Sequence, residues 1–261
     1  MSTSLSFFRE SGDGDSTVFL LHGAYGDSRY FDRLREALAG SGRRVVAWDC
    51  PGYGQSAVAD VDTVEGFAAA ATKLFDEVGT KRNVVLGHSM GSLIAPRAVN
   101  DSRRDIAGVI LSASSPGLKM RSQEDQDRFI AERLEPIHQG MSVAEYAPAL
   151  LKTMMGPGAS GPDVDHVVTV VSDMDTAVFE RSMKALTSYD NRPSLEALTP
   201  PTLLLAGEHD TACPPAGMRT MVDIIPNARY EEMSGVGHYG FAEDFDRYFA
   251  IVDGFLTEVG F

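Results

Sequence analysis

The sequence predicts an α/β protein in which helices cover both faces of a mostly parallel central sheet. Short apolar runs of strand length alternate with stretches of helical periodicity along most of the 261 residues. This alternation is typical of a parallel sheet that is buried on both sides. With 43% hydrophobic residues the chain can bury one sizeable core, so no second core is required.

Strands are expected wherever a short apolar run is bounded by polar or turn residues. At the N-terminus there is room for one good edge strand, so the usual edge hairpin is expected to be shortened or absent. The expected strands are Leu5–Arg9, Thr17–Leu21, Arg44–Trp48, Asn83–Leu86, Gly108–Ser112, Thr202–Leu205 and Ala228–Met233.

Helices are expected where apolar residues recur three or four positions apart. The stretch from Thr63 to Val78, for example, carries Val64, Phe67 and Leu74 at this spacing. The other helices expected in the core are Tyr30–Leu38, one that begins near Ser92, Ala216–Ile225 and Phe241–Val259.

The alternation stops between Leu118 and Asn191. Four helical runs follow one another there without a strand, and the Gly/Pro-rich loop Gly156–Pro162 is the best candidate for a hinge. We therefore divide the chain into a core of residues 1–117 and 192–261 and a helical insertion of residues 118–191. The expected helices of the insertion are Glu124–Ile137, Val143–Met155, Val164–Met174 and Thr176–Tyr189.

The most informative motif is Gly87-His88-Ser89-Met90-Gly91, which directly follows an expected strand and precedes an expected helix. This is the strand, turn and helix context of the nucleophile elbow G-x-S-x-G. A serine on so tight a turn has a strained backbone and an exposed hydroxyl. A Cβ atom at Gly87 or Gly91 would collide with the neighbouring strand or helix. Ser89 is therefore a candidate nucleophile.

A serine nucleophile needs a base, and the base needs a carboxylate that orients it. Asp210 lies in the loop after the strand that begins at Thr202, and His238 lies in the loop after the last expected strand. These residues are the candidate acid and base. Glu208 and Asp244 are the alternative carboxylates for orienting the imidazole.

The order Ser89, Asp210, His238 resembles that of the α/β-hydrolase fold. Two further segments resemble this family, namely His22-Gly23 after a strand and the D-x-P-G-x-G-x-S loop that runs from Asp49 to Ser56. The resemblance covers nearly the whole chain and implies the α/β-hydrolase fold with a serine nucleophile.

The resemblance also implies an oxyanion hole and a cap. By position, the oxyanion donors are the backbone N–H groups of Ala24 and Met90, and residues 118–191 form a helical cap over the active site. The cap is expected to line the substrate pocket, although its methionines could equally pack helix against helix. The residues expected at this pocket are Tyr25, His88, Met154, Met155, Met183 and Tyr239.

The elbow favours acyl transfer to water. Related haloalkane dehalogenases and epoxide hydrolases use an aspartate nucleophile, which Ser89 excludes. The layout most resembles enol-lactonases and small-ester carboxylesterases, so hydrolysis of a small ester or (enol-)lactone is the first hypothesis. The chain also resembles carbon–carbon hydrolases that act on ring-cleavage products. The elbow of those enzymes has the pattern G-N-S-M-G, whereas this chain has His88 in place of the asparagine, so this activity is the second hypothesis. A non-catalytic binding protein of the same fold is the third, and the complete triad argues against it.

Composition limits the partners. A net charge of −14 disfavours nucleic acid and anionic membrane surfaces, while a small acid remains possible as a substrate. Two cysteines do not make a disulfide framework, and the N-terminus lacks an apolar export segment, so a cytoplasmic enzyme is expected. Neither H-x-x-x-H nor C-x-x-C occurs, so no metal and no organic cofactor are expected. The oligomeric state stays open.

Overall fold

A computed structural model of the chain describes residues 5–58, 61–117, 119 and 122–261. Within these residues a seven-stranded sheet has the order β1-β3-β2-β4-β5-β6-β7. β1 pairs antiparallel with β3, and all other neighbours are parallel. The strands are β1 (Phe8–Ser11), β2 (Ser16–Leu21), β3 (Arg44–Trp48), β4 (Arg82–His88), β5 (Ile106–Ser112), β6 (Thr202–Gly207) and β7 (Ala228–Met233).

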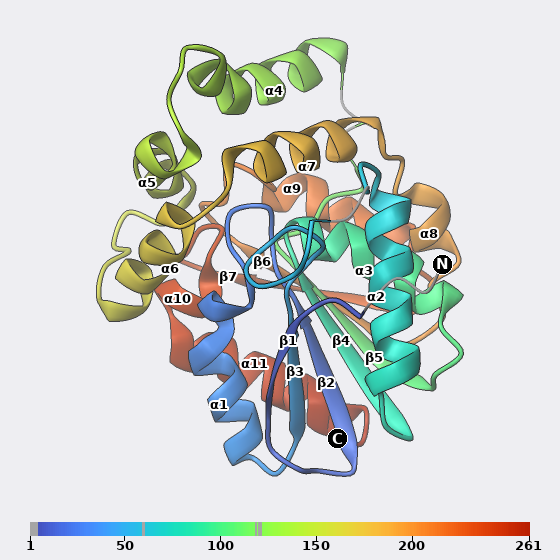
Figure 1. Cartoon of the computed structure of the whole chain (residues 1–261). Helices are drawn as coiled ribbons and strands as arrows, with labels where there is room; N and C mark the ends of the chain where they lie inside the picture. The colour runs from blue at the N-terminus through green and yellow to red at the C-terminus, as the bar shows by residue number, and fades with distance from the viewer. Residues whose placement is uncertain (1–4, 59–60, 118, 120–121) are drawn as a thin grey trace.

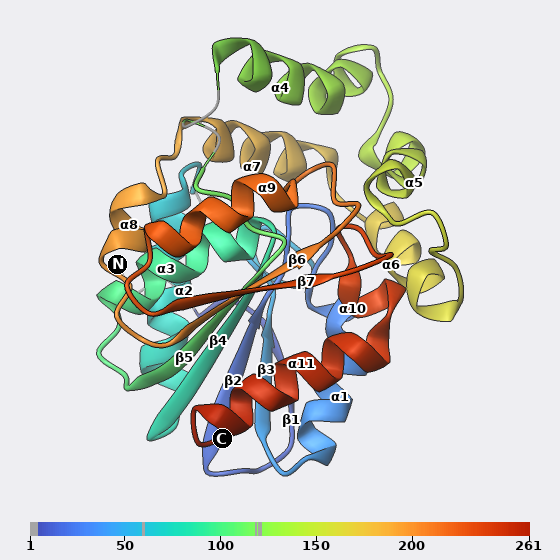
Figure 2. The ribbon, with the colours of Figure 1, turned by 180° about the vertical axis from the view of Figure 1, so that it is seen from behind.

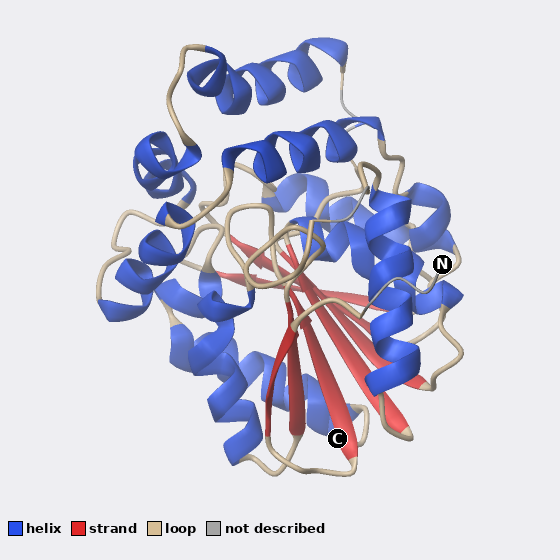
Figure 3. Cartoon of the chain, viewed as in Figure 1, coloured by secondary structure: helices blue, strands red, loops and turns tan. Residues whose placement is uncertain are grey.

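Helices cover both faces of this sheet, as the alternating pattern predicts (Figure 3). α11 lies behind the strands in Figure 1 and in front of them in the reverse view of Figure 2, with α1 beside it, while α2 and α3 pack together on the opposite face. The helices of the core are η1 (Ser28–Phe31), α1 (Asp32–Gly40), α2 (Val64–Val78), α3 (Met90–Asp101), α8 (Arg192–Glu196), α9 (Pro215–Arg219), η3 (Thr220–Asp223), α10 (Gly240–Glu243) and α11 (Phe245–Glu258).

The central strands are apolar because both of their faces are covered. Every residue of β6 is buried, and so are all but the first residue of β2 and of β4. The edge strand β7 is only partly buried and accordingly carries charged residues. Sequence alone thus separates the centre of the sheet from its edge.

Three elements differ from the sequence-based prediction. The N-terminal strand lies at Phe8–Ser11, slightly later than expected, and it is the one described strand that precedes β2, as predicted. The C-terminal helix is broken at Asp244, which has φ −144° and ψ 75° and whose side chain accepts a hydrogen bond from the N–H of Arg247. An aspartate that caps a new helix favours such a break over a continuous helix. The helix expected over Ala216–Ile225 is likewise split into α9 and η3.

The insertion consists of helices that lie beyond the carboxyl ends of the strands. In both ribbon views α7 lies close above these ends, whereas α4 lies farthest from the sheet (Figures 1 and 2). None of the helices in the described residues is long and apolar enough to cross a membrane. The helices of the insertion are α4 (Gln123–His138), α5 (Val143–Met154), α6 (Pro162–Ser172) and α7 (Thr176–Ser188).

Candidate active site

The turn between β4 and α3 holds a serine in a strained conformation. Ser89 has φ 52° and ψ −116°, a region that non-glycine residues rarely occupy. A Cβ atom on Gly87 would collide with the carbonyl of Gly91, and one on Gly91 would collide with the carbonyl of Leu21. The steric prediction for both glycines is therefore confirmed. A Cβ atom on Gly23 would lie 2.9 Å from the Cβ atom of Ser89, so the loop after β2 presses directly against the serine.

Two loops at the carboxyl end of the sheet bring an aspartate and a histidine together. Asp210 follows β6 and His238 follows β7, and the Nδ1 of His238 lies 2.8 Å from the Oδ2 of Asp210. Both side chains are buried. The other carboxylate oxygen of Asp210 accepts hydrogen bonds from the N–H groups of Ala212 (2.9 Å) and Cys213 (2.8 Å). The carboxylate is therefore fixed by backbone donors while it faces the imidazole.

The elbow and the His238 loop lie side by side. The ring of His88, the residue before Ser89, has its centroid 5.0 Å from that of His238. Within the described residues the Ser89 hydroxyl and the His238 ring form no hydrogen bond. In serine hydrolases this contact commonly tightens only in the substrate complex. The two alternative carboxylates serve elsewhere, because Glu208 accepts from the N–H of Gly235 and Asp244 caps α11.

The two amides expected in the oxyanion hole lie beside this serine. Ala24 and Met90 are buried, and within the described part of the chain neither N–H donates a hydrogen bond to the protein. Met90 is the first residue of α3, whose N-terminal N–H groups lack partners within the helix. Both amides are thus available to a negatively charged oxygen.

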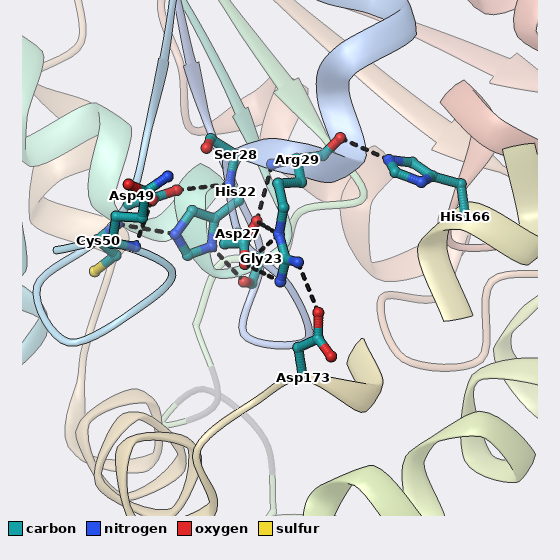
Figure 4. Close-up of polar contacts among 10 residues, drawn as sticks. His22, Gly23, Asp27, Ser28, Arg29, Asp49, Cys50, His166 and Asp173 are labelled. Atoms are coloured by element: carbon teal, nitrogen blue, oxygen red, sulfur yellow. Dashed lines mark hydrogen bonds and ion pairs between the residues drawn. The ribbon is translucent and has the colours of Figure 1, made fainter. Parts of the chain in front are cut away.

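The strand-end histidine His22 holds the loop that carries Ala24. Its Nδ1 donates to the carbonyl oxygen of Gly23 at 2.7 Å, and its Nε2 accepts from the N–H of Cys50 at 2.9 Å, as Figure 4 shows. These partners assign a neutral ring with the proton on Nδ1. Burial lowers the pKa of His22, in agreement with this state. Its role is therefore to tie two loops together.

Asp49, the first residue of the D-x-P-G-x-G-x-S loop, anchors the same region. Its two carboxylate oxygens accept from the N–H groups of Ser28 and Gln55, both at 2.9 Å. A Cβ atom on Gly54, which has φ 50°, would collide with this carboxylate. The motif therefore forms a tight loop and binds it to the start of η1, so its role is structural.

His88 is fully buried among aromatic rings. Its Nδ1 lies 3.3 Å from the Ser112 hydroxyl, whereas its Nε2 has no hydrogen-bond partner within the described residues. Phe31 and Phe241 meet the imidazole edge to face. Burial, above all, holds the pKa of His88 well below its usual value. This ring is therefore a neutral packing group directly behind the catalytic candidates.

The other residues expected at the pocket are also buried, and several contact the candidate triad. Tyr239 adjoins His238, and the carbonyl oxygen of Met154 accepts from the His238 N–H at 2.8 Å. The ring of Tyr25 packs against Phe179 of α7 with centroids 4.7 Å apart. The remaining two, on or next to the insertion helices, are Met155 and Met183.

One residue at this site was not predicted from the sequence. Glu243 accepts hydrogen bonds from the N–H groups of Gly156 (2.7 Å), Gly237 (2.8 Å) and Tyr239 (2.8 Å). It therefore fastens both sides of His238 and the start of the Gly/Pro-rich loop of the insertion. Two of these amides lie within six residues of Glu243, but Gly156 is 87 residues away, so no local pattern could have revealed the contact with the insertion.

One group of side chains in the described residues has the geometry of a possible metal site. It consists of Asp210, Cys213 and His238, whose ligand atoms all lie within 4.8 Å of one another. Such a set suits a soft divalent ion such as Zn²⁺. Both oxygens of Asp210 already accept hydrogen bonds, one of them from His238. A bound ion would therefore have to displace contacts on which the aspartate–histidine pair depends.

Fold and site together define an α/β-hydrolase fold protein. The chain matches the model of the serine aminopeptidase family S33 over residues 12–244 and belongs to this family. It is 24% identical to a proline iminopeptidase of Lactobacillus delbrueckii subsp. lactis (92% of this chain, 89% of the relative). It is 27% identical to a 2-hydroxy-6-oxononadienedioate/2-hydroxy-6-oxononatrienedioate hydrolase of Pseudomonas sp. (95% and 90%). The structure of a thermophilic esterase from Thermogutta terrifontis superimposes with a TM-score of 0.83 at 25% identity (98% and 94%).

Proposed function

We propose that this hydrolase cleaves a small carboxylic ester or lactone through an acyl-enzyme intermediate. The observation that carries the proposal is the buried Asp210–His238 pair, joined at 2.8 Å beside the strained turn of Ser89. A carboxylate that fixes an imidazole next to an activated serine is the arrangement that acyl transfer requires. No metal or organic cofactor enters this mechanism.

In the first half of the reaction the Ser89 hydroxyl attacks the ester carbonyl while Nε2 of His238 takes its proton. The Asp210 carboxylate stabilises the imidazolium, and the N–H groups of Ala24 and Met90 bind the negatively charged oxygen. Each oxyanion donor of this kind contributes about 3 kcal/mol to transition-state stabilisation. His238 then gives its proton to the departing alcohol, which leaves Ser89 acylated.

In the second half, water takes the place of the alcohol. His238 removes a proton from water as its oxygen attacks the acyl carbonyl, and the same two amides hold the second oxyanion. Collapse of this intermediate returns the proton to Ser89 Oγ and releases the carboxylic acid. For a lactone, the alcohol and the acid are the two ends of one product.

The second candidate is hydrolysis of a carbon–carbon bond in a ring-cleavage product. The relative from Pseudomonas sp. favours it, because its name describes hydrolysis of an oxo-dienedioate. Peptide hydrolysis is another possible outcome of the test below, because one relative is a proline iminopeptidase and the family is described as serine aminopeptidases. The insertion at residues 118–191, which we propose acts as a cap, decides among these substrates, since pocket shape selects substrates while the triad supplies the chemistry.

The test combines a substrate panel with labelling of the nucleophile. p-Nitrophenyl acetate and butyrate, an enol-lactone, a dienoate and proline p-nitroanilide are compared by kcat/KM, and the esters or the lactone should lead. A fluorophosphonate probe should label Ser89, as located by mass spectrometry of the digested protein. Ser89→Ala should block labelling and lower kcat by on the order of 10⁴ or more. Full activity in folded Ser89→Ala would refute the mechanism, and a leading dienoate or anilide would replace the ester assignment.

A further inference from the structure

The loop that leads to the candidate base is packed between two backbones. On the side of the sheet, a Cβ atom on Gly207 at the end of β6 would collide with the carbonyl of Gly237. On the side of the insertion, a Cβ atom on Gly237 would collide with the carbonyl of Met154. One on Gly156 would likewise collide with the carbonyl of Gly235. Gly156 and Gly237 both lie outside the left-handed region, so close approach alone excludes a side chain at these two positions.

The last turn of α5 uses its carbonyl groups to bind both triad loops. The last four carbonyls of a helix have no partner within the helix. In α5 the carbonyl of Met154 accepts from the N–H of His238 at 2.8 Å. The carbonyl of Thr153 accepts from the hydroxyl of Thr211 at 3.1 Å, and Thr211 directly follows Asp210. Two consecutive carbonyls of the insertion thus hold the loop of the base and the loop of the acid.

One carboxylate oxygen of Glu243 joins the same segments a second time. Its Oε2 accepts from the N–H of Gly156 at 2.7 Å and from that of Gly237 at 2.8 Å. Its Oε1 accepts from the N–H of Tyr239 at 2.8 Å, on the other side of His238. Backbone atoms before and after His238 are therefore tied to the insertion, so a shift of the insertion is passed on to the imidazole.

We propose that residues 153–156 of the insertion position the Asp210–His238 pair, so that the insertion takes part in the chemical step as well as in the choice of substrate. This proposal rests on the proposed ester hydrolysis at Ser89. Proton transfer from Ser89 to His238 requires hydrogen-bond distance in the substrate complex, and a misplacement of about 1 Å lowers the rate by on the order of 10²-fold. Even a substrate too small to contact the insertion therefore depends on it.

The main test compares two glycines of the loop after α5. Gly156→Ala forces the insertion away from the His238 loop, whereas nothing lies within 4 Å of the Cβ position of Gly158. For p-nitrophenyl acetate, Gly156→Ala should lower kcat by on the order of 10²-fold and change KM less than about threefold, since the lost interaction acts in the transition state. The loss should be the same for the butyrate ester. Gly158→Ala should leave kcat and KM unchanged.

A milder variant acts on the loop of the acid. Thr211→Val keeps the shape of the side chain but removes the hydroxyl that binds the carbonyl of Thr153. We expect kcat to fall about two- to fivefold because one exposed hydrogen bond is lost, and Thr211→Ser should restore most of the lost rate. The control is Thr169→Val in α6, because the hydroxyl of Thr169 donates to Asp165 within its own helix. It should leave kcat unchanged.

The rate of Ser89 labelling by a fluorophosphonate separates failure of this proposal from failure of the proposed function. Labelling needs the triad but no particular substrate, so Gly156→Ala should slow it even if the ester assignment is wrong. A folded Gly156→Ala that keeps the wild-type kcat and labelling rate, or that raises KM alone, would overturn the positioning role. If Gly156→Ala does not fold, Thr211→Val decides, and a kcat equal to that of Thr169→Val would overturn it. Wild-type ester cleavage in Ser89→Ala would refute the proposed function instead.

Discussion

The loops at the carboxyl end of the sheet and the helical insertion are held in place by different forces. The turn of Ser89 accepts only glycine at positions 87 and 91, because a Cβ atom there would collide with backbone atoms. Asp210 is held by two backbone N–H donors. The insertion meets the core through buried apolar packing, such as that of Phe179 against Tyr25, and also through side-chain ion pairs such as that of Arg29 with Asp173, whose carboxylate is 57% exposed. Steric constraints are unaffected by salt, whereas exposed ion pairs are screened. The turn of the candidate nucleophile is thus fixed by steric constraints, whereas the part proposed to select substrates is attached in part by ion pairs that salt can screen.

Figure 4 shows where these two kinds of contact meet. Arg29 lies between Asp27 of the core and Asp173 of the insertion, and its carbonyl oxygen faces His166 of α6 at 2.9 Å. Hydrogen bonds to the backbone attach the end of α5 and the residues after it, where the N–H of His238 donates to Met154 and Glu243 accepts from the N–H of Gly156. This second contact couples the insertion to the catalytic loop.

The largest effect should come from breaking the steric constraint. Gly91→Ala forces a Cβ atom into the carbonyl of Leu21, and backbone cannot move aside cheaply. We expect the free energy of unfolding to fall by about 3 kcal/mol, measured by urea denaturation. Gly254→Ala is the matched control, because nothing lies within 4 Å of its Cβ position in α11. It should raise stability by about 0.5–1 kcal/mol. Equal effects of the two substitutions would contradict the steric account of the elbow.

A smaller effect is expected at the contact that couples the two regions. In the wild type both carboxylate oxygens of Glu243 accept from backbone N–H groups. Glu243→Gln keeps one acceptor oxygen but places an NH₂ group opposite one of these N–H donors, so that two donors face each other. We expect a loss of about 2 kcal/mol in stability. Because the lost bonds flank His238, kcat should also fall about tenfold well below the melting temperature. Glu258→Gln, at an exposed carboxylate of α11, should change neither quantity. An unchanged kcat in destabilised Glu243→Gln would reduce Glu243 to a packing role.

The sequence predicted the rigid region better than the attachments. The bounds of β3 and β7 were predicted to the residue, and the collisions at Gly87 and Gly91 were predicted from the motif alone, since hydrophobic runs and glycine sterics are local properties. The α/β-hydrolase fold is confirmed as well. The division into a core and a cap, and the roles of the site residues, stay predictions. The contact of Glu243 with the insertion could not be found, because the amide of Gly156, 87 residues away in the chain, reaches it only in the folded protein.

Acid should destabilise the rigid region through its buried histidines. The pKa of His88 is lowered, chiefly by burial, so the native ring stays neutral when the unfolded ring takes up a proton below pH ~6.5. The unfolded state then binds more protons, and stability decreases as the pH falls. We expect His88→Asn to lessen this decrease by about 1 kcal/mol per pH unit between pH 6 and 5, measured by urea denaturation at several pH values. His209→Asn, at an exposed ring, should leave the slope unchanged, and a shared slope in all three proteins would exclude His88 as the source.

The smallest effect is expected at the ion pair that joins the insertion to η1. Asp173→Asn removes an exposed carboxylate, and Arg29 keeps its bonds to the buried Asp27. Stability should fall by less than about 1 kcal/mol, and the difference from wild type should vanish near 0.5 M NaCl because the pair is screened. Arg29→Met should cost more at any salt concentration, because burial alone raises the pKa of Asp27 and the hydrogen bonds from Arg29 more than compensate for it. A loss of 2 kcal/mol or more in Asp173→Asn that persists in high salt would mean that the insertion is attached as firmly as the elbow is built, and the contrast between the two regions would be wrong.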